Sequence, residues 1–212
     1  MSTQDHWESV YASRTDQELS WTQPDPHLSL SLIAEVCPAG SVIDVGAGTS
    51  SLPAKLLDRG YSVTVLDISA AAVTRGRERL GPRASMLQWI VADVTAGPGL
   101  GSFDLWHDRA VFHFLTNPAD RAAYIALLER TLAVGRHAVI ATFALDGPEK
   151  CSGLRVERYS GQTLHAELGA GFELLKTVPE LHVTPQGNTQ SFQYSVFRRV
   201  SGESGRRLLN SL

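Results

Sequence analysis

Three acidic residues could bind a ligand or take part in a reaction, because each lies at the end of a mainly apolar run. They are Asp44, Asp67 and Asp93. Apolar runs of this length, bounded by turn residues, are typical of buried β-strands. The parallel strands of an open α/β sheet end at one edge, and such folds bind their ligands in the crevice outside it. We therefore expect the three carboxylates to face a shared ligand site.

A glycine turn follows the first acid, with Gly46 and Gly48 in the sequence Asp-Val-Gly-Ala-Gly-Thr at residues 44–49. Glycines lack a Cβ atom, so the backbone can turn sharply here and approach a ligand closely. Asp67 lies about 20 residues further on, where a carboxylate accepts hydrogen bonds from the hydroxyls of an adenosine ribose. The spacing predicts a nucleotide-binding crevice lined by Gly46, Ala47 and Gly48.

The elements that must position these residues alternate between strands and helices. After the turn we expect a helix that stops at Gly60 and a second, capped by Ser69, that runs to Leu80. Asn117 and Pro118 open a third, which Gly135 should end. Strands are expected at 103–108 and 137–143, and this alternation requires right-handed crossovers and a mainly parallel sheet.

The two ends of the chain differ from this pattern. Asp5 reads as the N-cap of a helix, with Glu8 completing a capping box. A loop with two prolines at 18–26 follows, and a helix from 27 to 37 then leads into the first strand. Near the other end, the runs 172–183 and 189–200 predict an antiparallel hairpin, and we expect 201–212 to form a flexible tail.

The composition excludes several classes of function. The chain has 212 residues, a formal charge of −3 and two cysteines. We therefore expect one soluble domain with no basic surface for nucleic acid, no disulfide scaffold and no metal site, in a reducing cytoplasm. No apolar stretch reaches the length of about 18 residues that a membrane span needs, so neither a span nor a signal peptide is expected. The sequence does not distinguish a monomer from a homodimer, so both oligomeric states remain possible.

The acid-any-Gly-any-Gly motif at 44–48, followed by Asp67 and Asp93, resembles the class I S-adenosylmethionine (SAM) dependent methyltransferases. A nicotinamide-binding fingerprint would place a third glycine at Ser51 and usually lacks the acid, so that class is disfavoured. The resemblance covers about residues 5 to 200. It implies an α/β, Rossmann-like doubly wound sheet of seven strands in the order 3-2-1-4-5-7-6, with the last strand antiparallel.

The resemblance also implies the cofactor, SAM, which becomes S-adenosylhomocysteine (SAH) after transfer. According to this resemblance, Asp67 accepts hydrogen bonds from the ribose hydroxyls, and Asp93 accepts one from the adenine amino group. Val94 lies beside the adenine ring. Asp44 would organise the glycine turn and the amino end of SAM. The remaining cofactor contacts that we expect are Trp21, Thr49, Ile68 and Asp108. Residues 1–26 would form an N-terminal lid over a single methyltransferase domain at 27–200.

Methyl transfer from a sulfonium is an in-line displacement, and a base is needed only if the nucleophile arrives protonated. Asp108 and His113, which follow the fourth strand, are the candidate catalytic residues. Arg109 and Phe112 are the candidate substrate contacts. The competing interpretations are a turn residue for Asp108, a surface salt bridge for Arg109 and a packed ring for His113.

The expected reaction is methylation of a nucleophilic N, O or S atom in a small molecule. Parts of the chain, including Asp108, Arg109 and Phe112, also resemble lysine methyltransferases of elongation factor 1A, so a protein lysine is the alternative acceptor. A non-catalytic SAM-binding module is the second alternative. Arsenite methylation is set aside, because Cys151 is the only cysteine expected near the site.

Overall fold

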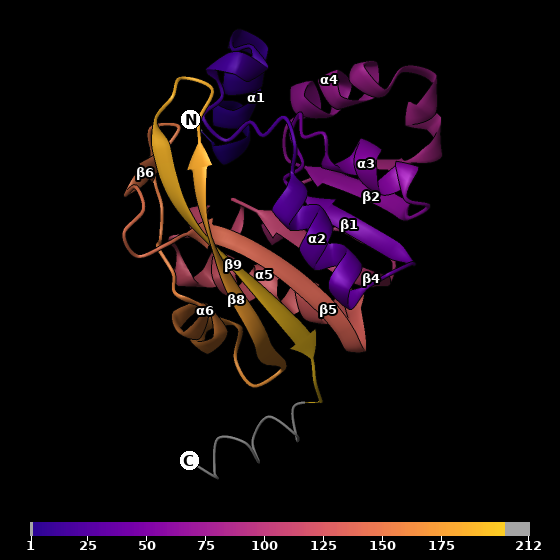
Figure 1. Ribbon diagram of the computed structural model, residues 1–212, viewed down its shortest axis with the longest axis vertical. Coiled ribbons are helices and arrows are strands. Elements are labelled where there is room, and N and C mark those ends of the chain that lie inside the picture. The colour runs from indigo at the N-terminus through magenta and orange to yellow at the C-terminus, as the bar shows by residue number, and fades with distance from the viewer. Residues whose placement is uncertain (1, 202–212) are drawn as a thin grey trace.

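A computed structural model describes residues 2–201, which are organised around a seven-stranded sheet (Figure 1). Its strands are β1 (Ser41–Val45), β2 (Ser62–Asp67), β3 (Gln88–Val91), β4 (Phe103–Arg109), β5 (Leu132–Phe143), β8 (Phe172–Val183) and β9 (Thr189–Arg199). Their order is β3-β2-β1-β4-β5-β9-β8, and β9 is antiparallel to both of its neighbours. The predicted order 3-2-1-4-5-7-6 is confirmed, since β8 and β9 are the sixth and seventh strands of this sheet.

Helices cover both faces of the sheet, and two apolar cores lie between them. The helices are α1 (Thr3–Ser13), α2 (His27–Val36), α3 (Leu52–Asp58), α4 (Ala70–Leu80), α5 (Pro118–Thr131) and α6 (Gly161–Leu168). Successive β1 residues point to opposite faces: Val42 packs with α2 and α3, whereas Ile43 packs with α5 and α6. The alternation follows from the pleat of a strand that is buried on both sides.

No helix within residues 2–201 has both the length and the apolar character needed to cross a membrane.

Short elements complete the chain. A small two-stranded hairpin, β6 (Lys150–Cys151) and β7 (Leu154–Arg155), lies between β5 and α6. Short 3-10 helices are η1 (Asp16–Glu18), η2 (Gly81–Met86), η3 (Val94–Ala96) and η4 (Phe112–Phe114). The expected tail begins at Ser201, and its remaining part, 202–212, lies outside the described residues.

Several predicted helix boundaries are confirmed and two are wrong. Ser69 caps α4 by accepting from the Ala72 N–H at 3.1 Å, and Asn117 caps α5 with Pro118 in the first turn. Gly135 does not end α5. That helix stops at Thr131, and Gly135 lies within β5 with φ at +88°. The helix passes directly into a strand, so no glycine cap is needed there.

The capping box of α1 is also displaced from its predicted position. Ser2 is the N-cap, and Asp5 completes the box from the third helical position. Glu8 reaches across to α4 instead, where its carboxylate accepts from the Ala70 and Ala71 N–H groups at 2.6 and 3.0 Å. A carboxylate is favourable there, because it satisfies free N–H groups and opposes the positive end of the helix dipole. Glu8 therefore fastens α1 to α4.

A second fastening lies between η1 and the exposed side of α4. Asp16 pairs with Arg75 and Arg79, and it also accepts from the Thr49 hydroxyl at 2.7 Å. Arg75 donates in addition to the Tyr11 carbonyl at 2.9 Å. In Figure 1, α1 lies between α4 and the tip of the β8–β9 hairpin, whose Gln186 donates to a carbonyl of η1. The N-terminal segment thus covers the edge of the sheet at which β1 and β2 end.

Candidate active site

Two adjoining cavities open at the carboxyl edge of the sheet, beneath the N-terminal segment. Residues from seven segments line the first, which we call the apolar cavity; they include Trp7, Trp21, Asp67, Asp93, Phe114 and Cys151. The second, the polar cavity, includes Ser29, Asp44, Ala47, Thr49, Arg79 and His107. Trp21, Gly46 and Arg109 line both cavities. A ligand that bends around Gly46 can therefore reach both.

The Asp67 carboxylate closes the glycine turn from the end of β2. One oxygen accepts from the Gly48 N–H at 2.7 Å and the other from the Ser69 N–H at 2.9 Å. Only 5% of the residue is exposed, and burial raises the pKa of its carboxyl to about 6. Each oxygen keeps a second lone pair for a ligand hydroxyl. Ile68 lines the apolar cavity beside it.

Asp93 and Val94 lie along the same cavity at the end of β3. Asp93 caps η3, because one of its oxygens accepts from both the N–H and the hydroxyl of Thr95, at 2.8 and 2.7 Å. The other carboxylate oxygen accepts no hydrogen bond from residues 2–201 and is available to a ligand amino group. The structure therefore brings Asp67, Ile68, Asp93 and Val94 to one cavity.

The glycine turn needs glycine for two reasons. Gly46 and Gly48 have φ angles of +66° and +54°, a region that side chains disfavour. A Cβ at Gly46 would lie 2.0 Å from the Val111 side chain, and one at Gly48 would lie 2.2 Å from the Tyr11 hydroxyl. Tyr11 thus covers Gly48, which lines neither cavity, whereas Gly46, Ala47 and Thr49 line the polar one.

A buried pair, Asp44 and His107, forms the floor of the polar cavity. Asp44 Oδ1 lies 2.7 Å from His107 Nδ1, and His107 Nε2 lies 2.9 Å from the Ser29 hydroxyl. Asp44 Oδ2 is buried without a hydrogen-bond partner among the described residues. Sequence reasoning missed His107. The available signal was the strand register, because Asp44 and His107 are directly paired between β1 and β4.

Arg109 separates the two cavities and is held from several directions. Its Nε donates to the Tyr194 hydroxyl at 3.0 Å, and its Nη1 donates to the Trp21 carbonyl at 3.0 Å. The guanidinium lies 4.3 Å from the centre of the Phe192 ring. Glu180 is 3.7 Å from Nη2. The expectation of a surface salt bridge is therefore wrong, since the Arg109 side chain is only 11% exposed.

Three candidate residues, in the last part of β4 and in η4, do not reach the cavities. Asp108 is fully buried and accepts from the Tyr124 hydroxyl at 2.7 Å and from the Val111 and Phe112 N–H groups. It therefore holds the turn into η4, and burial raises the pKa of its carboxyl to about 6. Phe112 is fully buried against the Tyr124 and Tyr159 rings. The expected cofactor, catalytic and substrate contacts of these two side chains are wrong.

His113 is likewise a packed residue rather than a base. It is fully buried, and its Nδ1 accepts from the Phe143 N–H at 3.2 Å. Its ring contacts the Phe114 and Phe143 rings at centroid distances of 4.5 and 4.7 Å. Burial lowers the pKa of the imidazole to about 3, so the ring is neutral, and it lines neither cavity. The interpretation of a packed ring is confirmed.

Aromatic rings form one wall of the apolar cavity. The Trp7 ring meets Trp21 at a centroid distance of 5.7 Å and Phe114 at 5.0 Å, both edge to face. Trp21 also meets Tyr11 at 6.2 Å. We call Trp7, Tyr11, Trp21 and Phe114 the aromatic wall.

Within residues 2–201 no group of three or more histidine, cysteine or acidic side chains is arranged to hold a metal ion.

The chain is similar to known methyltransferases in sequence. The family model described as a methyltransferase domain matches residues 42–135. The eEF1A lysine and N-terminal methyltransferase of Danio rerio is 30% identical over 148 residues, 68% of this chain and 21% of that protein. Nodulation protein S of Rhizobium tropici is 29% identical over 105 residues, which are 50% of this chain and 44% of that protein. The match thus spans less than half the length of either relative.

Solved structures share the whole fold. The N-methyltransferase NodS from Bradyrhizobium japonicum, solved with SAH, has a TM-score of 0.71 at 17% identity, covering 94% of this chain and 100% of that one. A protein studied for the conversion of a disulfide bond into a thioacetal group during echinomycin biosynthesis has a TM-score of 0.75 at 20% identity, covering 99% of both chains.

The residues present fit SAM. Gly46 lines both cavities, and Asp44 Oδ2 in the polar cavity is a buried acceptor without a hydrogen-bond partner among the described residues. Asp67 and Asp93 line the adjoining cavity at the ends of the next two strands. Residues 42–135 match the methyltransferase-domain family, and the strand order and this site are those of a class I SAM-dependent methyltransferase, with SAM as the cofactor.

Proposed function

We propose that this protein transfers the methyl group of SAM to a nucleophilic N, O or S atom of a small molecule. The observation that carries the proposal is the junction at Gly46, Trp21 and Arg109, where the two cavities meet. Asp44 lies in the polar cavity on one side of this junction, and Asp67, Asp93 and the aromatic wall lie in the apolar cavity on the other side. Such an arrangement aligns an acceptor with a methyl group and excludes water, which is most of what an activated donor requires.

The adenosine part of SAM would lie along Asp67, Asp93 and Val94. Asp67 would accept from the ribose hydroxyls, and Asp93 from the adenine amino group. The methionine part would enter the polar cavity, where the unpartnered oxygen of Asp44 would accept from the ammonium. This arrangement points the sulfonium methyl toward Arg109 and Trp21.

The size of the acceptor follows from what covers the site. Residues 1–26 would act as a lid over the domain at 27–200, because Glu8 and Asp16 fasten them to α4 and Trp7 and Trp21 line the apolar cavity. A lid of this kind encloses a small molecule more readily than a folded protein. Its closure would exclude water from the transfer step.

A lysine of a translation elongation factor is the second candidate acceptor. The 30% identity to a eukaryotic eEF1A methyltransferase favours it. Against it, the aromatic wall carries no free carboxylate to receive a lysine ammonium. The matched region is also only 21% of that relative, so the elements that grip its substrate need not be present here.

Cofactor binding is tested first. SAH at about 100 times its dissociation constant should stabilise the fold by about 2.7 kcal/mol, seen as a higher melting temperature. The absence of any shift with either SAM or SAH at millimolar concentration would remove the cofactor assignment.

Turnover is tested by the release of SAH from SAM with thiols, amines, phenols and elongation factor Tu as acceptors. We expect methylation of at least one small molecule and none of the protein. Stabilisation by SAH without any turnover would favour a non-catalytic SAM-binding module, and turnover with elongation factor Tu alone would favour the lysine methyltransferase.

A further inference from the structure

The acceptor side of the apolar cavity contains no group suited to remove a proton near neutral pH. Asp67 and Asp93 belong to the cofactor side. Burial raises the pKa of the Cys151 thiol to about 12 and that of the Tyr11 hydroxyl well above its ordinary value. His113 and Asp108 lie outside the cavity. Among the described residues that line it, the remaining ionisable side chain is Arg109, which is a permanent cation.

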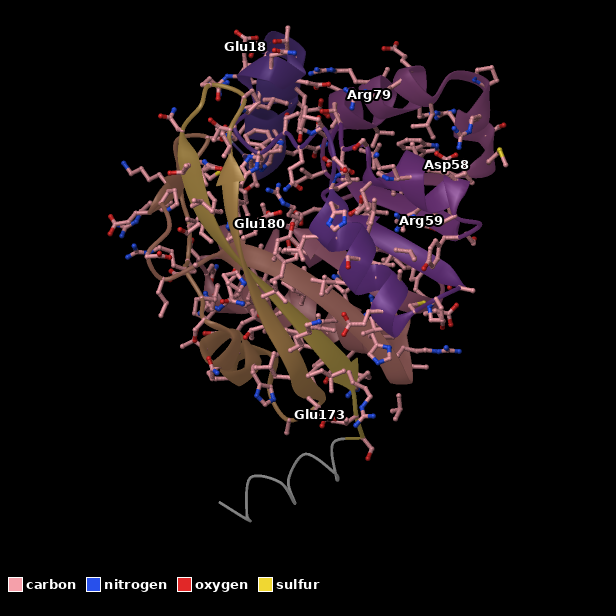
Figure 2. All side chains as sticks on the ribbon, in the orientation of Figure 1. Glu18, Asp58, Arg59, Arg79, Glu173 and Glu180 are labelled. Carbon is pink, nitrogen blue, oxygen red and sulfur yellow. The ribbon has the colours of Figure 1, made fainter. Side chains whose placement is uncertain are left out.

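Arg109 is a cation that is fixed before any acceptor binds. Tyr194, the Trp21 carbonyl and the face of Phe192 engage three sides of its guanidinium. Nη2 is buried and makes no hydrogen bond to any residue that the structure describes. Glu180, labelled in Figure 2, lies 3.7 Å from this nitrogen. Its two carboxylate oxygens accept hydrogen bonds from the Gln23 amide at 3.1 and 3.2 Å.

An unused donor on a buried guanidinium calls for an anionic oxygen, sulfur or nitrogen. Hydrogen bonds between charged partners are roughly twice as strong as neutral ones, and a fixed guanidinium loses little conformational entropy when it forms one. Beside it, Trp7, Trp21 and Phe114 of the aromatic wall present ring edges and faces. Such surfaces favour a flat, polarisable ligand.

We propose that the acceptor is a flat aromatic or heteroaromatic molecule whose nucleophilic atom is already ionised when it enters, and that Arg109 holds this anion in line with the methyl group. The inference rests on the proposed function and names its substrate class. Arg109 Nη2 would bind the anion, while the aromatic wall would hold the ring. Aromatic thiolates and acidic phenolates are the simplest members of this class.

The transfer step balances without a base. A lone pair of the acceptor anion attacks the methyl carbon, and a new bond forms between the nucleophilic atom and that carbon. The bond between the carbon and the sulfonium sulfur breaks, and its electron pair stays on sulfur. An anion and a sulfonium thus become a neutral methylated product and a neutral thioether, and no proton moves. Arg109 must then release a neutral product, for which it has little affinity.

The first test compares acceptors that differ in one property, using SAM and the full chain. Benzenethiol and phenol share a shape, but only benzenethiol is substantially ionised near neutral pH. Benzenethiol and 2,2,2-trifluoroethanethiol are both acidic thiols, but only the first is flat. We expect kcat/KM for benzenethiol to exceed both others by at least about tenfold. Equal rates with aniline, which is flat and neutral, or with the aliphatic thiol would overturn the proposal.

The second test is the pH dependence of kcat/KM for benzenethiol and 4-nitrobenzenethiol. Without a protein base, the rise in rate should follow the ionisation of each thiol, so the two profiles should have different midpoints. The titratable groups that face Arg109 are Glu180 and His182 of β8, Tyr194 of β9, Cys151 of β6 and His113 of η4. One midpoint shared by both thiols would reveal a protein base and overturn the proposal.

The third test removes the cation. Arg109→Met should lower kcat/KM for benzenethiol by at least about tenfold, since a charge-assisted hydrogen bond is lost, while the Kd of SAH changes by less than about threefold. Arg109→Lys should restore part of the rate. Arg198→Met is the matched control, because Arg198 pairs with Glu173 on the exposed side of the hairpin. Unchanged kcat/KM in a folded Arg109→Met protein would overturn the role of Arg109.

The outcomes separate this inference from the proposed function. If the Arg109→Met variant does not fold, the two pH profiles of the unmodified protein test whether the acceptor enters as an anion. A protein that binds SAH but methylates neutral acceptors, or none of the flat anions, contradicts the acceptor class alone. A protein that does not bind SAH contradicts the proposed function itself.

Discussion

The two cavities of this protein are built in different ways. Around the polar cavity and the cofactor end of the apolar one, ligand-facing groups come from the glycine turn and the ends of β1, β2 and β3. The aromatic wall instead brings together α1, the Trp21 loop and η4. The first region is fixed by the sheet and by hydrogen bonds to its backbone, and the second depends on side-chain packing between segments that are distant in sequence. Cofactor binding should therefore tolerate changes that acceptor binding does not.

Arg109 and Trp21 connect the two regions, because each lines both cavities and the Arg109 guanidinium holds the Trp21 carbonyl. The Trp21 loop is also tied to the C-terminal hairpin. His182 lies 2.8 Å from the Ser20 carbonyl, and Gln23 donates to Glu180. Changes in either strand of the hairpin can thus reach the acceptor side without touching the cofactor side.

The largest effect should follow from Asp67→Ala. Two hydrogen bonds from ribose hydroxyls to a charged acceptor are worth about 1.5–3 kcal/mol each, so the affinity for SAH should fall by at least about tenfold. Isothermal titration measures this. Asp25→Ala is the control, since Asp25 is an exposed acid paired with Lys55. Equal affinities in both folded variants would show that the ribose is held elsewhere.

His107→Phe should mainly affect stability. It removes the hydrogen bond to Asp44 and leaves that carboxylate buried without its partner, which typically costs about 3–5 kcal/mol. Urea unfolding monitored by circular dichroism measures the loss. His107→Asn, which can still donate to Asp44, should lose less. If the Phe variant is as stable as the unmodified protein, Asp44 does not depend on His107.

SAH binding should depend on pH through Asp67. Burial raises the pKa of this carboxyl to about 6 in the folded protein, above its ordinary value of 3.8, so protonation stabilises the ligand-free fold and that contribution is lost as pH rises through 6. The ribose hydroxyls prefer the ionised form. The affinity for SAH should therefore fall by up to about tenfold per pH unit below 6.

The control for this pH dependence is Asp67→Asn, which should weaken binding and flatten the profile between pH 4 and 7. An unchanged profile in that variant would assign the titration to another group, such as Asp108.

The smallest effect is expected for the aromatic wall. If residues 1–26 act as a lid, SAH should slow proteolysis within residues 12–26, and Trp21→Ala should weaken this protection and the binding of ligand. Limited proteolysis with and without SAH measures the difference, with Trp89→Ala, outside both cavities, as the comparison. Equal cleavage rates in both states would leave Trp21 as a packing residue.

The same difference between the regions explains what could be predicted from the sequence. The glycine turn and the position of Asp67 and Asp93 at one edge follow from local pattern and strand direction, and both are found. The side chains after β4 could not be placed in this way. Ala110 adopts a φ of +74°, and η4 then turns Phe112 and His113 into the core. No local signal marks that turn, because packing against Tyr124 and Phe143 stabilises it.

The aromatic wall was only partly visible in the sequence, for the same reason. Trp21 stood out in a loop bounded by prolines, but the partners that it meets, Trp7 and Phe114, lie in separate segments. Glu8 was assigned to its own helix, whereas it caps α4. Each of these contacts depends on how the N-terminal segment lies across the sheet, which the local pattern does not specify.

A crystal structure of the SAH complex would show directly where the cofactor binds. We expect the ribose hydroxyls on Asp67, the adenine between Asp93 and Val94, and the methionine end over Gly46 with its ammonium on Asp44. The sulfur should then face Arg109 and Trp21. SAH bound outside the two cavities, or bound with its adenine in the polar cavity, would contradict this assignment of the site.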